Sequence, residues 1–318
     1  MKVNRAREGD FLETVEGLIF DVKGVCHPPD RVISFLRYIP DINGERKRDE
    51  KSYRKVYDLG ERFRVLREQF PQYVYVDPVF NRELQGVCHS DISRMYNPER
   101  RLKQILETPQ NKTEEKVASL AEVLGIPVER MGVSGSVLVG LDAVDSDLDI
   151  MVYGEEWCRQ AYAVLKRLRE DGVLQPLDAK GAQEKALFRW GSDDEVLVEL
   201  EREKVMHGLF EGREYFFRFL KAEEVPYGDV VYRPLHKTSI TAQVADDSQT
   251  IFTPCVYEVT GCSVTGVARL ISVRGRFCEQ ASRGDSVAAR GTLEKVEGRG
   301  NVFLQIVMQD SDDFLIPE

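Results

Sequence analysis

The chain has 318 residues, 42% of them apolar, and a formal net charge of -10. Single-core domains rarely exceed about 250 residues, so we expect more than one domain. The acidic balance argues against a passive coat on nucleic acid, and the sequence contains neither an apolar membrane span nor an apolar N-terminal signal. We therefore expect a cytoplasmic protein that has no membrane partner.

Residues 1–110 are predicted to form a small α+β domain. Segments 15–22 and 31–39 are rich in β-forming residues, and the Gly- and Pro-containing turn between them predicts a hairpin. Apolar periodicity then predicts two further strands and two helices, in chain order at 51–57 (strand), 58–70 (helix), 73–79 (strand) and 97–106 (helix).

A basic cluster lies in this first domain beside Tyr53 and Tyr57, and it consists of Arg46, Lys47, Arg48, Lys51, Arg54 and Lys55. Residues 1–110 carry 20 Lys and Arg against 18 Asp and Glu, whereas residues 111–318 carry 24 against 36. Cations beside aromatic rings suit phosphate contacts and base stacking, so an RNA or DNA acceptor is expected here. The alternative is an exposed charged loop, because acidic residues are interleaved with the basic ones.

Residues 111–235 contain the most informative segment of the chain. A helix that Thr113 can cap ends at Gly125, and a second helix is predicted over 155–170. Between them, a strand ends in Gly135-Ser136, and the next strand carries Asp147-Leu148-Asp149.

Side chains alternate between the two faces of a strand, so Asp147 and Asp149 are expected to point the same way. Leu148, Ile150 and Val152 would then face a core. Paired carboxylates suit Mg²⁺, and two such ions can clamp a phosphoryl group during its transfer. Glycine lets the backbone approach a phosphate closely, and the Ser136 hydroxyl can hydrogen-bond to its oxygens.

This arrangement resembles the motif of the DNA polymerase beta-type nucleotidyltransferase superfamily, which includes the CCA-adding enzymes and kanamycin nucleotidyltransferase. The motif match covers about residues 113–203, and the whole chain looks more loosely like archaeal predicted nucleotidyltransferases that carry N- and C-terminal extensions. The resemblance implies an α+β fold with a polymerase beta-like core, a mixed sheet with flanking helices, over residues 111–235. It also implies a nucleoside triphosphate as substrate, which Gly135 and Ser136 would bind.

The superfamily has a third carboxylate on a later strand, beside the Asp pair. Segments 186–190 and 195–200 flank Gly191-Ser192-Asp193-Asp194 and are predicted to form a hairpin. Glu199 follows Val196-Leu197-Val198 and is the expected third acid, which would complete the metal shell with Asp147 and Asp149. Glu201 shares its face and stays an alternative, while Lys204 and Arg202 are interpreted as solvated charges.

Three other interpretations compete for the Asp cluster. An Asp-x-Asp can belong to a solvated loop. Asp145, Asp147, Asp149 and Glu156 also match positions 1, 3, 5 and 12 of a calcium loop, but Ile150 stands where that loop needs glycine. The third is a nucleotidyltransferase fold that has lost catalysis.

Residues 236–318 are predicted to form a small β-barrel. Strands are expected near 238–244, 250–259, 264–274, 286–296 and 301–309, with Gly- and Asp-rich turns, and an OB-like fold is one form that five short strands can take. OB barrels often bind single strands through aromatic stacking. Since this segment has few aromatic residues and is net acidic, scaffolding or homo-oligomer formation is the favoured role.

The six cysteines are scattered without CxxC pairs and are expected to be reduced thiols. The dipeptides Cys26-His27 and Cys88-His89 could together supply four zinc ligands, although adjacent ligands in a dipeptide are geometrically awkward.

The sequence therefore predicts a metal-dependent nucleotidyltransferase that moves a nucleoside monophosphate from a nucleoside triphosphate to an acceptor hydroxyl. Nucleic acid is the expected acceptor, with RNA favoured. One alternative is a catalytically silent protein that uses the same fold for binding or regulation. Another is a nucleotidyltransferase that acts on a protein or a small molecule.

Overall fold

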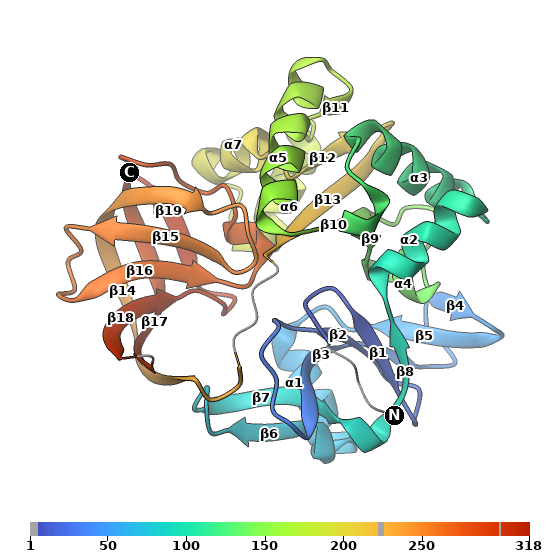
Figure 1. Ribbon diagram of the computed structural model, residues 1–318, viewed down its shortest axis with the longest axis horizontal. Coiled ribbons are helices and arrows are strands. Elements are labelled where there is room, and N and C mark those ends of the chain that lie inside the picture. The colour runs from blue at the N-terminus through green and yellow to red at the C-terminus, as the bar shows by residue number, and fades with distance from the viewer. Residues whose placement is uncertain (1–5, 222–225, 299) are drawn as a thin grey trace. The chain divides into compact units, whose positions relative to one another are not determined.

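The computed structural model describes residues 6–221, 226–298 and 300–318. Over these residues the chain has a mixed α+β fold with three sheets and seven α-helices (Figure 1). It divides into two compact units, of which the first comprises Met1–Met151 with Glu223–Tyr227 and the second comprises Val152–Ala222 with Gly228–Glu318. The predicted α+β class is confirmed.

An eight-stranded sheet lies in the first unit, where six strands follow the order β4-β5-β3-β2-β1-β8 and β7 pairs with β3 and β6. The bounds are β1 Phe11–Thr14, β2 Ile19–Val22, β3 Arg31–Pro40, β4 Arg46–Arg48, β5 Lys51–Lys55, β6 Val74–Asp77, β7 Arg82–Cys88 and β8 Ile92–Tyr96. The predicted hairpin is confirmed, since β2 and β3 pair antiparallel. Strands β1, β4, β7 and β8 were not predicted.

Three helices accompany this sheet in the same unit. They are α1 (Leu59–Gln69), α2 (Pro98–Glu107) and α3 (Lys112–Leu124). The Asp58 side chain caps α1 by accepting from the Glu61 amide at 2.8 Å, and Val65 and Leu66 join the core that covers one face of the sheet.

The predicted cap of α3 is wrong by two residues. The Asn111 side chain caps this helix by accepting from the Glu114 amide at 3.0 Å, and Thr113 is a buried residue inside the first turn. Asparagine and threonine are both good N-cap residues, so the sequence alone did not separate them. Gly125 ends the helix at φ +66°, as expected.

A five-stranded sheet has the order β11-β12-β13-β10-β9, and the division between the units falls within β10. The bounds are β9 Met131–Val133, β10 Leu148–Tyr153, β11 Leu174–Gln175, β12 His207–Phe210 and β13 Arg213–Leu220. The short helix α4 (Gly135–Val139) connects β9 to β10, and α5 (Glu155–Glu170) confirms the helix predicted after the Asp pair.

The predicted hairpin over 186–200 is wrong, because both segments are helical. They belong to α6 (Ala179–Trp190) and α7 (Glu195–Glu203), which Asp178 and Asp194 cap. The run Val196-Leu197-Val198 favoured a strand by composition. Instead, Leu197 and Glu201, four residues apart, form the buried face of α7, which is the spacing of a helix.

The third sheet lies in the second unit and has the order β14-β15-β16-β18-β17-β19. Because β14 also pairs with β17, five strands form a closed ring and β19 adds to β17. The bounds are β14 Val230–Gln249, β15 Cys255–Thr260, β16 Val267–Ser272, β17 Ser286–Gly298, β18 Asn301–Val307 and β19 Phe314–Pro317. All five predicted strands are present, although β14 begins earlier than expected and β19 was not predicted.

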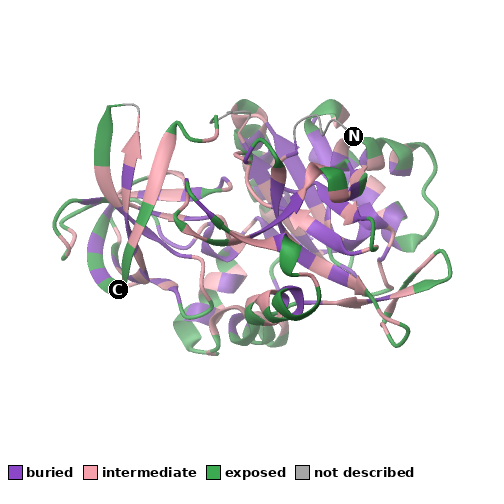
Figure 2. Ribbon diagram, turned by 90° about the horizontal axis from the view of Figure 1, so that it is seen from below, coloured by how far each residue is buried: buried purple, intermediate pink, exposed green. Residues whose placement is uncertain are grey.

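The strands of both units carry most of the buried residues, whereas the helices have exposed outer faces (Figure 2). The three sheets fall approximately within the three ranges that the sequence divided at 110 and 235. None of the helices in the part of the chain that the structure describes is long and apolar enough to span a membrane.

Candidate functional site

The predicted Gly-Ser pair and the second aspartate lie together in the first unit. The Ser134 amide donates to the Asp149 carbonyl oxygen at 2.8 Å, so the end of β9 is tied to the start of β10. Gly135 has φ +62°, and a Cβ there would lie 1.9 Å from Asp149 Oδ2. The Asp149 carboxylate therefore packs directly on bare glycine backbone, and only glycine provides both that space and that backbone conformation.

Burial in β10 is more extensive than strand alternation predicts, because Met151 and Tyr153 are buried as well as the predicted core residues. Leu148, Ile150 and Val152 are fully buried, whereas Asp149 is half-buried and Asp147, which immediately precedes the strand, is exposed. The apolar side chains thus anchor a rigid strand, and the two aspartates stand at its accessible start.

The Gly-Ser helix packs on the eight-stranded sheet of the same unit. Leu138, Val139 and Leu141 join a buried cluster with side chains from five strands of that sheet, namely Phe11, Ile19, Tyr38, Tyr53 and Tyr96. In addition, the Ser134 hydroxyl donates to the Gly9 carbonyl oxygen at 2.7 Å. The N-terminal sheet is therefore part of the scaffold of the candidate site.

Two members of the predicted basic cluster have structural partners. Arg48 forms an ion pair with Glu13 at 2.9 Å and donates to the Val139 carbonyl oxygen at 2.9 Å, which joins β4 to α4. Arg54 pairs with Glu61 at 2.7 Å and with Asp41 at 3.6 Å. These arginines are already neutralised, so the prediction that the whole cluster contacts phosphate is too broad.

Two other cations of the first unit lie beside the Asp149 region. Arg46 donates to the Ser146 hydroxyl at 3.2 Å, and its buried Nε has no hydrogen-bond partner among the described residues. Burial lowers the pKa of the Lys55 ammonium, and the neighbouring Arg37 lowers it further, whereas Asp149 opposes the shift.

Arg37 is a neighbour that the sequence did not predict. In the β2–β3 ladder, Tyr38 is opposite Ile19 and Leu36 is opposite Phe20, so a register shift leaves Arg37 as an extra residue. Such bulges redirect side chains. The pairing of Tyr38 with Lys55 between β3 and β5 then brings Arg37 close to the basic cluster.

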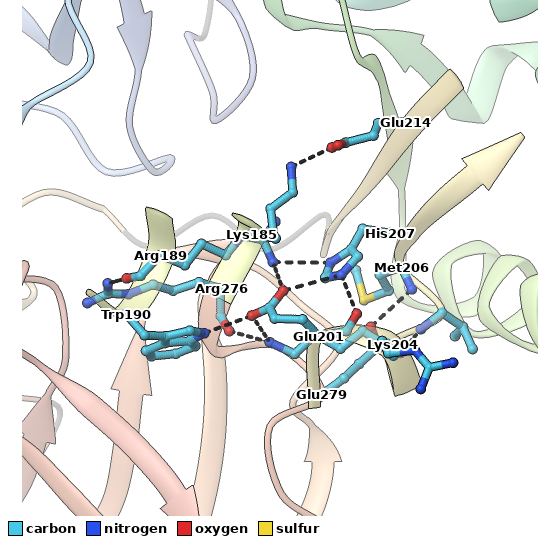
Figure 3. Close-up of polar contacts among 12 residues, drawn as sticks. Lys185, Arg189, Trp190, Glu201, Lys204, Met206, His207, Glu214, Arg276 and Glu279 are labelled. Atoms are coloured by element: carbon cyan, nitrogen blue, oxygen red, sulfur yellow. Dashed lines mark hydrogen bonds and ion pairs between the residues drawn. The ribbon is translucent and has the colours of Figure 1, made fainter. Parts of the chain in front are cut away.

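The two candidates for the third carboxylate lie on α7 in the second unit. Glu199 is exposed and pairs with Arg202 at 3.0 Å. Glu201 is fully buried in the ion network of Figure 3, where it accepts from Arg189 at 2.6 Å and from Trp190 at 2.8 Å. Neither residue is the strand-borne carboxylate that the sequence predicted.

In the network around Glu201, the carboxylate is paired with two cationic side chains, those of Arg189 and Lys204. Burial alone would raise the pKa of Glu201, but Lys204 and Arg189 lower it to about 2. Lys204 is only 2% exposed, and its ammonium donates to Glu201 at 3.3 Å and to the Arg276 carbonyl oxygen at 2.7 Å. The prediction that Lys204 is a solvated charge is therefore wrong.

The described residues limit which metal centre the Asp pair can form. Among them, the three acidic side chains that lie close enough together to hold one metal ion are Asp310, Asp312 and Asp313. Their carboxylates already form ion pairs with the Lys237 ammonium, at 2.5, 3.7 and 2.5 Å. Within the described residues, Asp147 and Asp149 belong to no such group of three. Two carboxylates suit one Mg²⁺ that completes its shell with water and phosphate oxygens, and the expected centre of two ions and three carboxylates stays a prediction.

The zinc hypothesis for the Cys-His dipeptides finds no support in the structure. Both ring nitrogens of His27 are engaged, because Nε2 lies 3.1 Å from the Ala6 carbonyl oxygen and Nδ1 accepts from the Ile33 amide at 3.2 Å. Burial lowers the pKa of this imidazole to about 4. His27 therefore has no ring nitrogen left for a metal.

The second unit contains a cavity of about 510 Å³ that the sequence did not predict. Its charged lining is balanced, with three cationic and three acidic side chains, namely Arg159, Lys166, Lys204, Glu203, Asp247 and Glu279. This balance gives the cavity no preference for a ligand of either sign.

No protein-family model and no solved structure matches the chain. Uncharacterized protein MJ1086 of Methanocaldococcus jannaschii is 30% identical over 324 residues, which cover 96% of this chain and 95% of that protein. The chain belongs to the family of that protein. The similarity spans both structural units, so the whole two-unit chain, and not the Gly-Ser and Asp segment alone, is what the two proteins have in common.

Proposed function

We propose that this protein is a metal-dependent nucleotidyltransferase, which transfers a nucleoside monophosphate from a nucleoside triphosphate to an acceptor hydroxyl and releases pyrophosphate. The observation that carries the proposal is the contact between the Asp149 carboxylate and the bare backbone of Gly135. A strand, a Gly-Ser helix and an Asp-x-Asp strand follow one another in this segment, which is the pattern of the polymerase beta-type superfamily.

In this proposal, Asp147 and Asp149 hold one Mg²⁺, which when bound would neutralise phosphate charge and lower the pKa of a coordinated hydroxyl. The exposed Asp147 and the half-buried Asp149 are both accessible to a ligand. Gly135 and Ser136 contribute backbone and hydroxyl groups to the phosphate side of the site. Glu199 has no role in it, because it lies on α7 and pairs with Arg202.

The favoured acceptor is RNA, and the support comes from the exposed part of the basic cluster. Lys47 and Lys51 are exposed on β4 and β5, and Tyr57, which follows β5 in the chain, is 52% exposed. Exposed cations can contact a phosphate backbone, and an exposed aromatic ring can stack on an unpaired base.

The closed ring of the second unit supports a finer proposal for its fold. Numbered from β14, its strands follow the order 1-2-3-5-4 and close back on strand 1, and β16 runs parallel to β18. We propose that this ring is an OB-like barrel. Since its segment is net acidic, we propose scaffolding or self-association for it rather than single-strand binding.

One observation favours a second candidate function, a catalytically silent protein that binds nucleotide. Among the described residues no third carboxylate gathers at the Asp pair, and Lys55 lies close enough to Asp149 to act as a partial counter-charge. A protein of this kind would bind a nucleoside triphosphate without turning it over.

The test is to incubate the full chain with each labelled nucleoside triphosphate, Mg²⁺ and total RNA, and to measure label transfer and pyrophosphate release. We expect transfer that chelator abolishes. The Asp147→Asn, Asp149→Asn double variant should lose at least about 100-fold of the activity, since loss of a metal's supporting groups alone costs 10- to 100-fold.

Asp145→Asn is the matched control, because it removes an exposed carboxylate from the same segment. It should retain full activity. Undiminished turnover by the double variant would refute the assigned roles, whereas tight binding of Mg-triphosphate without transfer to any RNA, protein or metabolite pool would favour the silent alternative.

A further inference from the structure

We propose that Arg37, Arg46 and Lys55, the cationic triad, form a phosphate-binding site for the triphosphate chain of the nucleotide. This inference rests on the proposed function and adds to it the part of the site that the N-terminal sheet supplies. The sequence pointed to a broad basic cluster as a nucleic-acid surface, whereas the structure selects two of its members and adds Arg37.

The three cations converge from three strands of one sheet. Lys55 Nζ lies 4.6 Å from the Tyr57 ring centroid and Arg37 Cζ lies 5.9 Å from it, so both cations contact the same ring. Arg46 reaches the Ser146 hydroxyl at 3.2 Å, one residue before Asp147. Burial raises the pKa of the Tyr38 phenol, and Arg37, Arg46 and Asp149 all act on that phenol electrostatically, so these three charged groups share one neighbourhood.

Among the described residues, the triad also lacks the close ion pairs that other arginines of the same unit form. Arg48 is paired with Glu13, and Arg54 with Glu61 and Asp41. By contrast, no ion pair joins Arg37, Arg46 or Lys55 to a carboxylate of the described residues within 4.0 Å, and the buried Arg46 Nε lacks a hydrogen-bond partner there. Neighbouring like charges that are partly buried repel one another, and a bound anion would relieve that repulsion.

The location favours the triphosphate over a nucleic-acid backbone. Arg37, Arg46 and Lys55 are half-buried close to Asp149, whereas Lys47 and Lys51 are exposed on the same hairpin. A compact chain of three phosphates that also meets a metal at the Asp pair fits the half-buried position. A long phosphodiester backbone needs the exposed one.

The first experiment measures binding of inorganic tripolyphosphate to the full chain by calorimetry, in chelator so that no divalent metal takes part. We expect binding that Lys55→Gln and Arg37→Gln each weaken about 10-fold, the effect of losing one charge-assisted contact. Lys47→Gln, the same charge change on the same hairpin, should not alter it, and Lys55→Arg should restore most of it. Thermal unfolding of each variant verifies that it is folded.

Equal tripolyphosphate affinity of the wild type and of all these variants would overturn the triad. A second result would also overturn the triad. If Lys55→Gln raised KM for the RNA acceptor but left KM for the triphosphate unchanged, the site would bind nucleic acid and not the triphosphate. Triad-dependent tripolyphosphate binding in a protein that transfers no nucleotide would support the triad while refuting the proposed function. Nucleotide transfer whose KM for the triphosphate is unchanged in Lys55→Gln and Arg37→Gln would support the proposed function and refute the triad.

Discussion

The two units place their charged residues in opposite ways. In the second unit, Glu201, Arg189 and Lys204 form a buried network in which each charge meets an opposite one. In the first unit, Arg37 and Lys55 contact the same aromatic ring without a paired carboxylate, beside the accessible Asp149. Saturated charges contribute to the fold, whereas uncompensated charges that water can reach are available to a ligand.

Removing the centre of the saturated network should have the largest effect on stability. Glu201→Ala leaves the buried Lys204 and the half-buried Arg189 without their paired carboxylate, and losing one partner of a buried pair costs about 3–5 kcal/mol. We expect a decrease of that size in the free energy of unfolding, measured by urea denaturation.

Glu199→Ala is the matched control on the same helix. Its exposed pair with Arg202 is worth at most about 1 kcal/mol. If Glu201→Ala were as mild as Glu199→Ala, the network would not stabilise the second unit, and the contrast between the units would fail.

The sequence predicted the candidate site better than its surroundings. The Gly-Ser and Asp segment is local, since Gly135 and Asp149 belong to one continuous stretch that runs from β9 through the short helix α4 to β10. Arg37 could not be identified in the same way, because a bulge and a β3–β5 pairing bring it to the site. The prediction of a third carboxylate on a strand failed for a different reason. Val196-Leu197-Val198 fits a strand by composition, but it belongs to the helix α7.

A difference in protonation sharpens the comparison between the units. In the second unit the network keeps Glu201 charged, with a pKa of about 2. In the first unit, burial raises the pKa of Asp10 to about 7 and lowers that of His27 to about 4, so both groups are neutral between about pH 4 and pH 7. To the pH dependence of stability, Asp10 contributes up to about 4 kcal/mol and His27 up to about 3 kcal/mol.

These two contributions have opposite signs over nearly the same range. Asp10 stabilises fully below pH 3.8, and its contribution is lost as the pH rises to about 7. His27 stabilises fully above pH 6.5, and its contribution is lost as the pH falls to about 4. In the wild type they largely cancel.

Single substitutions should therefore reveal each contribution. His27→Gln should give a free energy of unfolding that falls as the pH rises from 4 to 7, and Asp10→Asn should give one that rises. Urea denaturation at four or five pH values measures both slopes. If the free energies of unfolding of the two variants changed with pH in the same way, Asp10 and His27 would not titrate as their burial requires.

The smallest expected change in stability tests the contact that carries the proposed function. Gly135→Ala introduces a Cβ 1.9 Å from the Asp149 carboxylate at a positive φ, so the carboxylate must move. The positive φ alone costs about 1–2 kcal/mol for alanine, and Gly125→Ala is the matched control, because its φ is +66° and nothing lies within 4 Å. Gly135→Ala should lose at least as much stability as Gly125→Ala, measured by urea denaturation, and only Gly135→Ala should also lose nucleotide transfer or Mg-triphosphate binding. Equal activity in the two would mean that the position of Asp149 against Gly135 is a packing feature without chemical consequence.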